Sequence, residues 1–171
     1  MMIKFLGCAL VFICSVKIGS SLCNKTRKRV LALRSFKEMF EIFKIKFEYE
    51  YITIPQLMDE MKNGKNQIIC DFSKNCSENL KRRMNLKESW DKACKDISKA
   101  HFLSQDDLMI ITGFSQNFGE TALSGQITQI ESYISRFNKI ISESEKEQIQ
   151  KNKVTMTCTT FAGLILILVF I

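Results

Sequence analysis

Residues that could carry chemistry are scarce in this sequence, which has a single histidine, His101. A zinc site built from Cys94 and His101 would need two more ligands, and no recognisable spacing supplies them. The sequence also lacks a P-loop, a GxGxxG motif and an HExxH motif. We therefore expect a protein that is not an enzyme and that has no catalytic, cofactor-binding or metal-binding residues.

The seven cysteines form no Cys-x-x-Cys pair, and no strand-like alternation of apolar and polar residues occurs. Scattered cysteines in odd number are typical of a reducing compartment, where the thiol serves as a small apolar side chain. Apolar residues recur instead at spacings of three and four, which is the period of an α-helix. The predicted fold class is all-α.

The net charge is +7 at neutral pH, and much of the excess comes from two basic clusters, Lys25–Arg29 and Lys151–Lys153. Basic clusters beside apolar runs are better explained by anionic lipid headgroups than by nucleic acid. A third cluster, Lys81–Arg83, has no aromatic platform or nucleic-acid motif beside it, so a solvated helix face is the simpler interpretation. We expect membrane lipid among the partners and no nucleic acid.

The chain ends in an apolar run without any charge, Val154–Ile171. At 1.5 Å per residue this run would reach about 27 Å as a helix, close to the roughly 30 Å hydrocarbon core of a bilayer. A buried core helix is the alternative interpretation. The basic flank, Lys151 and Lys153, and the absence of a polar face favour a transmembrane helix.

A second apolar run, Phe5–Val16, lies behind Lys4 and is followed by Lys17. This pattern fits a cleaved signal peptide. A retained anchor is favoured because the cluster Lys25–Arg29 follows at once, and such clusters favour the cytoplasmic side of a membrane. Lys17 can reach the interface through its long aliphatic stem.

Both basic clusters face the middle of the chain, which predicts a hairpin with both termini across the membrane. We expect an N-terminal transmembrane anchor at residues 1–23, a cytoplasmic all-helical domain at 24–153 and a C-terminal transmembrane helix at 154–171. Small residues recur every four positions in both predicted spans. Such faces let helices approach closely in lipid, although ordinary span composition explains them equally well. These transmembrane packing residues are Ser15, Gly19, Thr155, Thr159 and Gly163.

Two long helices, Thr26–Tyr51 and one that starts at Gly125, are expected to form an antiparallel pair within the central domain. Their apolar stripes match when both helices start at the membrane. The predicted contacts are Phe36 with Ile141, Phe40 with Phe137, Phe43 with Ile134 and Phe47 with Ile130. Four shorter helices lie between them, near 55–62, 68–80, 86–100 and 105–118, and Trp90 is the expected anchor of their core. Ser104 is the expected N-cap of the last of these four helices.

Several short motifs, in this order along the chain, resemble the stage III sporulation protein AB family. They are Tyr49–Pro55, Ser89–Ala93, Asn117–Thr121, Ser124–Ile127 and Glu145–Lys153 running into Phe161–Leu164. The resemblance covers the whole length, with a span at each end. The matched positions are caps, core and links, so the resemblance carries over no catalytic residue.

The resemblance implies a non-enzymatic platform subunit of the channel complex that sporulating cells build between mother cell and forespore. It implies a multi-pass protein of the mother-cell membrane facing the forespore, with its central domain cytoplasmic. The family is similar to the inner-membrane platform protein of type II secretion systems, which a cytoplasmic ATPase contacts. The implied partners are other membrane subunits and such an ATPase, and homo-oligomers are compatible with it. A membrane-anchored sensor or regulator with a helical signalling domain is the alternative function.

Overall fold

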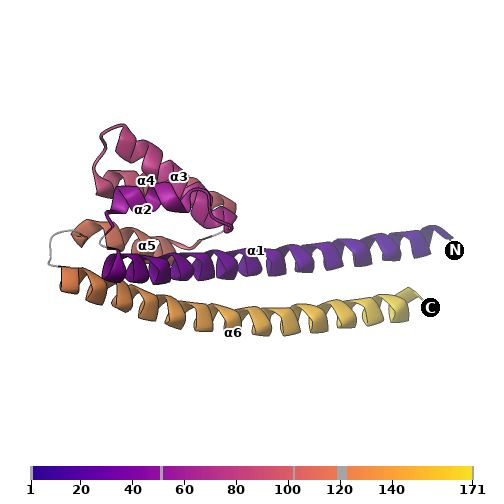
Figure 1. The fold of residues 1–171 in the computed structure, drawn as a ribbon. Helices are drawn as coiled ribbons and strands as arrows, with labels where there is room; N and C mark the ends of the chain where they lie inside the picture. Colours follow the sequence, from indigo (N-terminus) through magenta and orange to yellow (C-terminus); the bar gives the residue numbers. More distant parts are fainter. Residues whose placement is uncertain (1, 51, 102, 119–122, 171) are drawn as a thin grey trace. The chain divides into compact units, whose positions relative to one another are not determined.

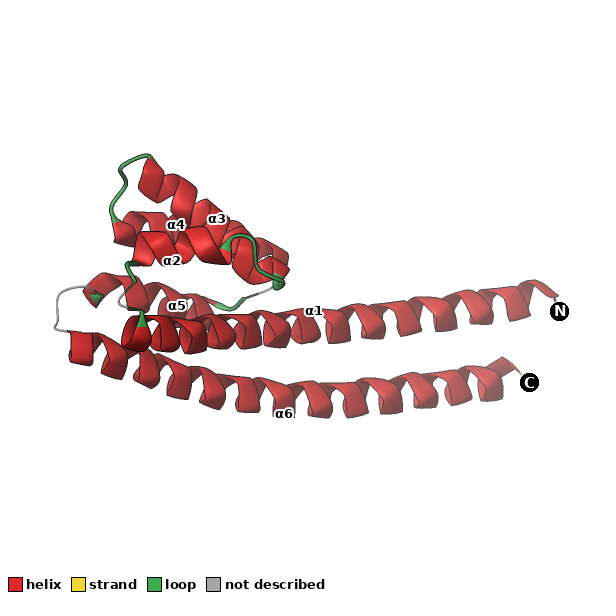
Figure 2. Cartoon of the chain, in the orientation of Figure 1, coloured by secondary structure: helices red, strands yellow, loops and turns green. Residues whose placement is uncertain are grey.

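The computed structural model describes the backbone of residues 2–50, 52–101, 103–118 and 123–170. It describes the side chains of residues 17, 24–50, 52–98, 103–116, 118, 124–155, 157–158 and 161–162. The described backbone forms six helices and contains no strand (Figure 1; Figure 2). The helices are α1 (Met2–Tyr49), α2 (Ile54–Met61), α3 (Gln67–Lys81), α4 (Leu86–His101), α5 (Gln105–Asn117) and α6 (Leu123–Phe170).

The prediction of a transmembrane helix at each end is wrong. Among the residues that the structure describes, no helix is both long and apolar enough to cross a membrane. The prediction depended on the length of the apolar runs. Lys17 interrupts the N-terminal run, and most side chains of both runs lie outside the part of the chain whose side chains the structure describes. The membrane-anchored bundle, and the multi-pass location that followed from it, are corrected accordingly.

The chain divides into two compact units. One unit combines Met1–Lys28 with Glu143–Ile171, and the other is Arg29–Ser142. Helices α2 to α5 belong entirely to the second unit, whereas α1 and α6 each cross a boundary between the units. The second unit lies inside the predicted central domain, residues 24–153.

Side-chain caps explain where two of the short helices begin. The Asn66 side-chain oxygen accepts a hydrogen bond from the Ile68 amide at 3.2 Å in the first turn of α3. At the start of α5 the Ser104 hydroxyl accepts a hydrogen bond from the Asp107 amide at 3.1 Å, and the Asp107 carboxylate accepts one from the Ser104 amide at 2.8 Å. This reciprocal pair is a capping box, which satisfies backbone donors that a helix leaves free at its N-terminus. The expected N-cap at Ser104 is confirmed.

An aromatic core lies at the centre of the unit Arg29–Ser142. The ring centroid of Phe40 in α1 lies 4.7 Å from that of Phe114 in α5 and 5.4 Å from that of Phe137 in α6. In the same core the Trp90 ring of α4 lies 4.8 Å from the Phe72 ring of α3. Such ring pairs add about 0.5–1.5 kcal/mol each to the stabilisation that comes from apolar burial. The aromatic contacts therefore join five of the six helices.

Candidate functional site

The residues predicted to form the core and the helix pair all lie in the unit Arg29–Ser142. Their side chains are buried, except for that of Ile134, which is half-buried. They carry no reactive group, so they provide packing and no chemistry. These residues are Phe36, Phe40, Phe43, Phe47, Trp90, Ile130, Ile134, Phe137 and Ile141.

Side-chain contacts set the register of α1 and α6 within this unit. The Phe36 ring stacks on the Phe137 ring at 6.4 Å between centroids, and Phe40 approaches the same ring at 5.4 Å. At the surface the Lys44 ammonium lies 2.6 Å from the Glu131 carboxylate. The hydrogen bond to Glu131 raises the pKa of Lys44 above its ordinary value. The two helices therefore meet through a buried aromatic contact and an exposed ion pair.

Most of the residues predicted to pack the transmembrane helices have side chains that the structure does not describe. Ser15, Gly19, Thr159 and Gly163 lie outside the residues whose side chains are described. Thr155 is described and half-buried, and it lines a hollow of about 680 Å³ in the unit formed by the chain ends. Their proposed role depended on the membrane spans and is withdrawn with them.

A buried ion pair joins α1 to α5. The Arg29 guanidinium donates from Nε and Nη2 to the two Asp107 carboxylate oxygens at 2.7 and 2.9 Å, and the Asp107 side chain is only 1% exposed. Burial alone would raise the pKa of Asp107. The hydrogen bonds from Arg29 and Ser104 outweigh burial and hold this pKa below its ordinary value. The carboxylate therefore stays ionised and holds α5 against α1.

A second charged cluster joins α2 to α3 around Asp59. Its Oδ1 atom accepts hydrogen bonds from the Ser77 hydroxyl at 2.5 Å and from the ammonium groups of Lys81 and Lys62 at 2.9 and 3.0 Å. These hydrogen bonds, the one from Ser77 first, hold the pKa of Asp59 far below its ordinary value. Because the Asp59 side chain is 41% exposed, solvent screens the cluster and it contributes little to stability.

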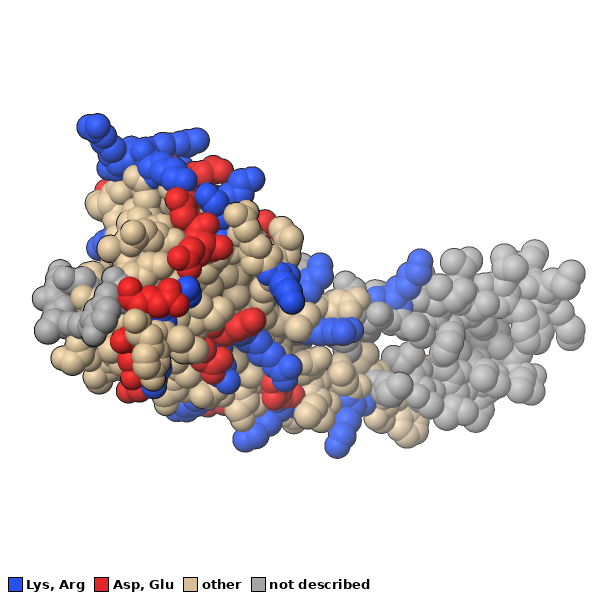
Figure 3. All heavy atoms as spheres, viewed as in Figure 1, with Lys and Arg blue, Asp and Glu red and all other residues tan. Residues whose placement is uncertain are grey.

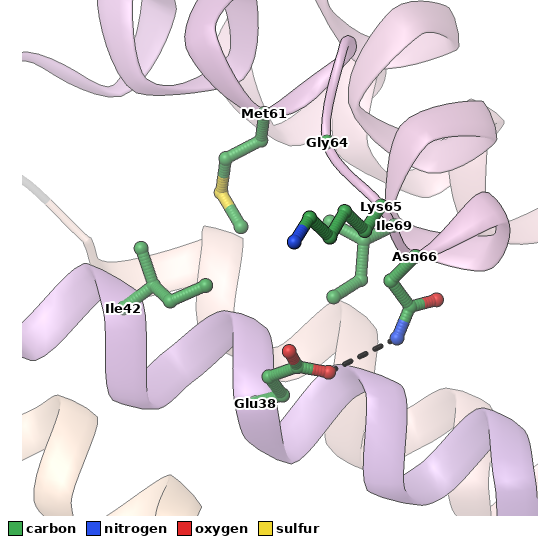
Figure 4. Close-up of a pocket in the computed structure, with 7 residues that line it drawn as sticks. All are labelled: Glu38, Ile42, Met61, Gly64, Lys65, Asn66 and Ile69. Atoms are coloured by element: carbon green, nitrogen blue, oxygen red, sulfur yellow. Dashed lines mark hydrogen bonds between the residues drawn. The ribbon is translucent and has the colours of Figure 1, made fainter.

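A hollow of this unit opens between α1 and the loop that joins α2 to α3 (Figure 4). Its volume is about 370 Å³. The walls are the apolar side chains of Ile42, Met61 and Ile69. At the rim the Asn66 amide donates to the Glu38 carboxylate at 3.0 Å, as the dashed line in Figure 4 shows.

Seven residues line this hollow, and the remaining two are Gly64 and Lys65. In Figure 4 the Lys65 side chain extends into the opening. Apolar walls with a carboxylate, an ammonium and an amide at the rim suit a small amphipathic group. None of the seven is a hydroxyl or thiol nucleophile held beside a base. The hollow is therefore suited to binding.

The buried thiols of the same unit are inert. Burial raises the pKa of Cys76 to about 12 and that of Cys94 well above its ordinary value. A thiol that stays protonated is a poor nucleophile and a poor metal ligand. Within the part of the chain that the structure describes, no group of three or more His, Cys, Asp or Glu side chains could hold a metal ion. The side chain of His101 lies outside that part.

Sequence reasoning missed the ion pair, the Asp59 cluster and the hollow. It assigned Arg29 to a membrane-flanking cluster, and nothing in the sequence relates Arg29 to a carboxylate 78 residues away. The available signal was an acidic residue, Asp107, three positions after the expected N-cap Ser104. No sequence pattern predicts the hollow, because its walls come from three separate segments of the chain.

Comparison with models of known protein families gives a match over nearly the whole chain. The model of a family described as stage III sporulation protein AB matches residues 4–171, nearly the whole chain. No curated protein and no solved structure matches the chain. The matched range contains every motif that resembled this family in the sequence. The chain therefore belongs to the stage III sporulation protein AB family.

Proposed function

We propose that this chain is a non-enzymatic assembly subunit of the channel complex that sporulating cells build between the mother cell and the forespore. The observation that carries the proposal is the family match over residues 4–171, which implies a role in stage III of sporulation. The proposed platform role within that stage comes from the similarity of this family to the inner-membrane platform protein of type II secretion systems. The proposed place of action is the mother-cell side of the forespore boundary.

The fold of the unit Arg29–Ser142 supports an assembly role. A subunit that binds several partners needs a framework that keeps its surfaces in fixed positions, because ordering a surface on binding costs affinity. Here α1 and α6 pack through Phe36, Phe40 and Phe137, and the pair Arg29–Asp107 ties α5 to α1. The short helices are thus presented on a packed core.

The proposed partners are other subunits of the same complex and an ATPase of that complex. In this proposal the ATPase supplies the energy, and the chain is the platform on which the other subunits are held. Homo-oligomers are compatible with the role. The bound groups would be protein surfaces, and the hollow between α1 and the α2–α3 loop is one place where such contact can be tested.

Co-purification from sporulating cells tests the proposal. The tagged chain should replace the native copy, be cross-linked at the engulfment stage and be recovered with other sporulation proteins, including an ATPase. A strain that lacks the chain should stop at stage III. Recovery of the chain alone, together with normal spore formation in the deletion strain, would contradict the assembly role.

A matched pair of variants tests the hollow in the same cells. Ile42→Glu puts a carboxylate into its wall, whereas Ile45→Glu puts one on the same helix at a side chain that is already 56% exposed. Loss of partners from Ile42→Glu alone would assign the hollow as a contact site. Equal recovery of partners with both variants would exclude the hollow and move the contact to another surface.

A further inference from the structure

Four basic side chains surround the turn between α3 and α4, and we call this group the basic tip. It consists of Lys81, Arg82, Arg83 and Lys87, all exposed. Lys and Arg side chains gather over this turn at the top of the space-filling view (Figure 3), and the stretch Asn79–Lys87 contains no acidic residue. Lys81 pairs with Asp59 at 2.9 Å. Among the described residues, no carboxylate forms an ion pair with the other three cations.

Helix stability accounts for two of these four charges. Lys81 is the last residue of α3 and Arg82 is its C-cap. Cations at a helix C-terminus interact favourably with the partial negative charge of the free carbonyl groups. Stabilisation of the C-terminus of α3 is therefore a sufficient explanation for the charges of Lys81 and Arg82.

The fold disfavours the other two basic residues, Arg83 and Lys87, at their positions. Lys87 is the second residue of α4, where the partial positive charge of the helix N-terminus repels a cation. Arg83 has φ of 64°, in the left-handed region that glycine prefers. Its amide donates to the Leu80 carbonyl at 2.9 Å, and the Met84 amide donates to the Asn79 carbonyl at 3.2 Å. These two bonds form a Schellman closure, in which this position is usually glycine.

A residue that breaks a local rule without gain to the fold is expected where function requires it. Arg83 and Lys87 both keep a positive charge at positions where glycine and an acidic residue would serve the fold better. The common property that they preserve is the positive charge of one exposed turn. That points to a negatively charged ligand.

The turn is also held rigidly, which favours specific recognition. The Schellman closure fixes the end of α3, and the Asn85 side chain accepts a hydrogen bond from the Glu88 amide at 2.8 Å at the start of α4. A surface that is already ordered loses less entropy when it binds. Arginine adds a planar fork of donors that matches the two oxygens of a carboxylate.

We propose that the basic tip docks a carboxylate-rich segment of a partner protein. A protein is favoured over a lipid surface because no described side chain of the turn is a large, exposed apolar group that could enter a bilayer. A nucleic acid is disfavoured because no aromatic side chain accompanies the charges. The inference stands on this surface alone and does not rest on the channel proposal.

The decisive variant is Arg83→Gly/Lys87→Glu in the full chain, because it should lower binding without harming the fold. Binding of a fluorescein-labelled oligoglutamate peptide is measured by anisotropy at low and at physiological salt. We expect the affinity to fall about tenfold or more, since a charge-assisted contact is worth roughly a factor of ten. The thermal unfolding temperature should stay the same or rise, because both substitutions suit their backbone positions.

The matched control is Lys92→Gln/Lys95→Glu, which changes the net charge by the same amount at exposed positions of α4. Its affinity should remain within about twofold of the native chain, because exposed charges away from the contact are screened by salt. An oligoglutamine peptide should not bind. The proposal is overturned if the native chain does not bind oligoglutamate, if both variants lose affinity equally, or if the tip variant binds as well as the native chain. It is also overturned if the tip variant loses binding only to phosphatidylglycerol vesicles, which would assign the tip to lipid.

Discussion

Asp107 shows how one carboxylate serves two structural purposes. It is nearly fully buried, caps the start of α5 through Ser104 and receives both donors of the Arg29 fork. A charge in such a place stabilises the fold only while its partners remain, because an unpaired buried charge is costly. The N3 residue of the α5 capping box is therefore also the link between α1 and α5.

Asp107→Asn should lower the free energy of unfolding by about 2 kcal/mol, because it removes the charged half of a bidentate pair whose arginine is still partly exposed. Urea denaturation followed by circular dichroism measures the change. Asp106→Asn is the matched control at the adjacent, exposed position. A loss at Asp106 as large as that at Asp107 would show that helix-end charge, and not the ion pair, matters.

The same residue predicts a pH dependence. The pKa of Asp107 is lower in the folded chain than in the unfolded chain, so its stabilising contribution is complete above the unfolded value of about 4. That contribution is lost as pH falls below this value toward the folded pKa. Unfolding measured across this acid range should therefore show a smaller loss of stability for Asp107→Asn than for the native chain. Parallel curves for the two proteins would contradict the assignment.

At the scale of elements, Asn66 joins the start of α3 to α1. Its oxygen caps α3, while its amide nitrogen donates to the Ser35 hydroxyl and to the Glu38 carboxylate, both at 3.0 Å. The cap and the bridge can be separated by substitution. Asparagine and aspartate are about equally good caps, but only asparagine carries a donor.

Asn66→Ala should lower the free energy of unfolding by about 1–2 kcal/mol because it removes both the cap and the bridge. Asn66→Asp should keep the cap but lose the bridge and bring a second carboxylate beside Glu38. Chemical denaturation gives the stabilities, and amide hydrogen exchange reports the first turn of α3. Fast exchange there in Asn66→Ala but not in Asn66→Asp is expected. Equal exchange rates in both variants would rule out the capping role.

The α1–α6 contact can be tested at the protein surface without damage to the core. Lys44 and Glu131 face each other at 2.6 Å between charged atoms. In a background without native cysteines, Lys44→Cys/Glu131→Cys should cross-link efficiently within one molecule through a short bismaleimide. Ile45→Cys/Glu131→Cys is the control, because adjacent residues of a helix point about 100° apart. Equal yields from the two pairs would contradict the register.

At the scale of the whole molecule, helix periodicity predicted more of the structure than amino-acid composition did. The all-helical architecture, the cap at Ser104 and the boundaries of α2 to α5 follow from local patterns within about two residues, because caps and stripes are written in adjacent positions. The membrane anchors were predicted from apolar length, and no helix among the described residues is long and apolar enough to cross a membrane. The pair Arg29–Asp107 and the hollow at Ile42 depend on which helices meet, and no local pattern states that.

The division of the chain into two units leads to the broadest prediction. The unit Arg29–Ser142 contains Phe40, Trp90 and the rest of the aromatic core, so a fragment of residues 29–142 should unfold cooperatively on its own. Phe40→Ala should lower the free energy of unfolding by about 3–5 kcal/mol, because a fully buried ring is replaced by a cavity. This loss should be equal in the fragment and in the full chain, since changes in separate units add independently.

Urea denaturation of four proteins makes the comparison: the full chain and the fragment, each with and without Phe40→Ala. Ile45→Ala is the control on the same helix, and its cost should stay within about 0.5 kcal/mol because this side chain is exposed. If Phe40→Ala unfolds the fragment, Phe40→Leu provides a milder change of the same kind. A fragment without a cooperative transition would show that the chain ends are needed to fold the core. A much smaller cost of Phe40→Ala in the fragment would show that the core is rearranged without those ends, and either result would overturn the two-unit description.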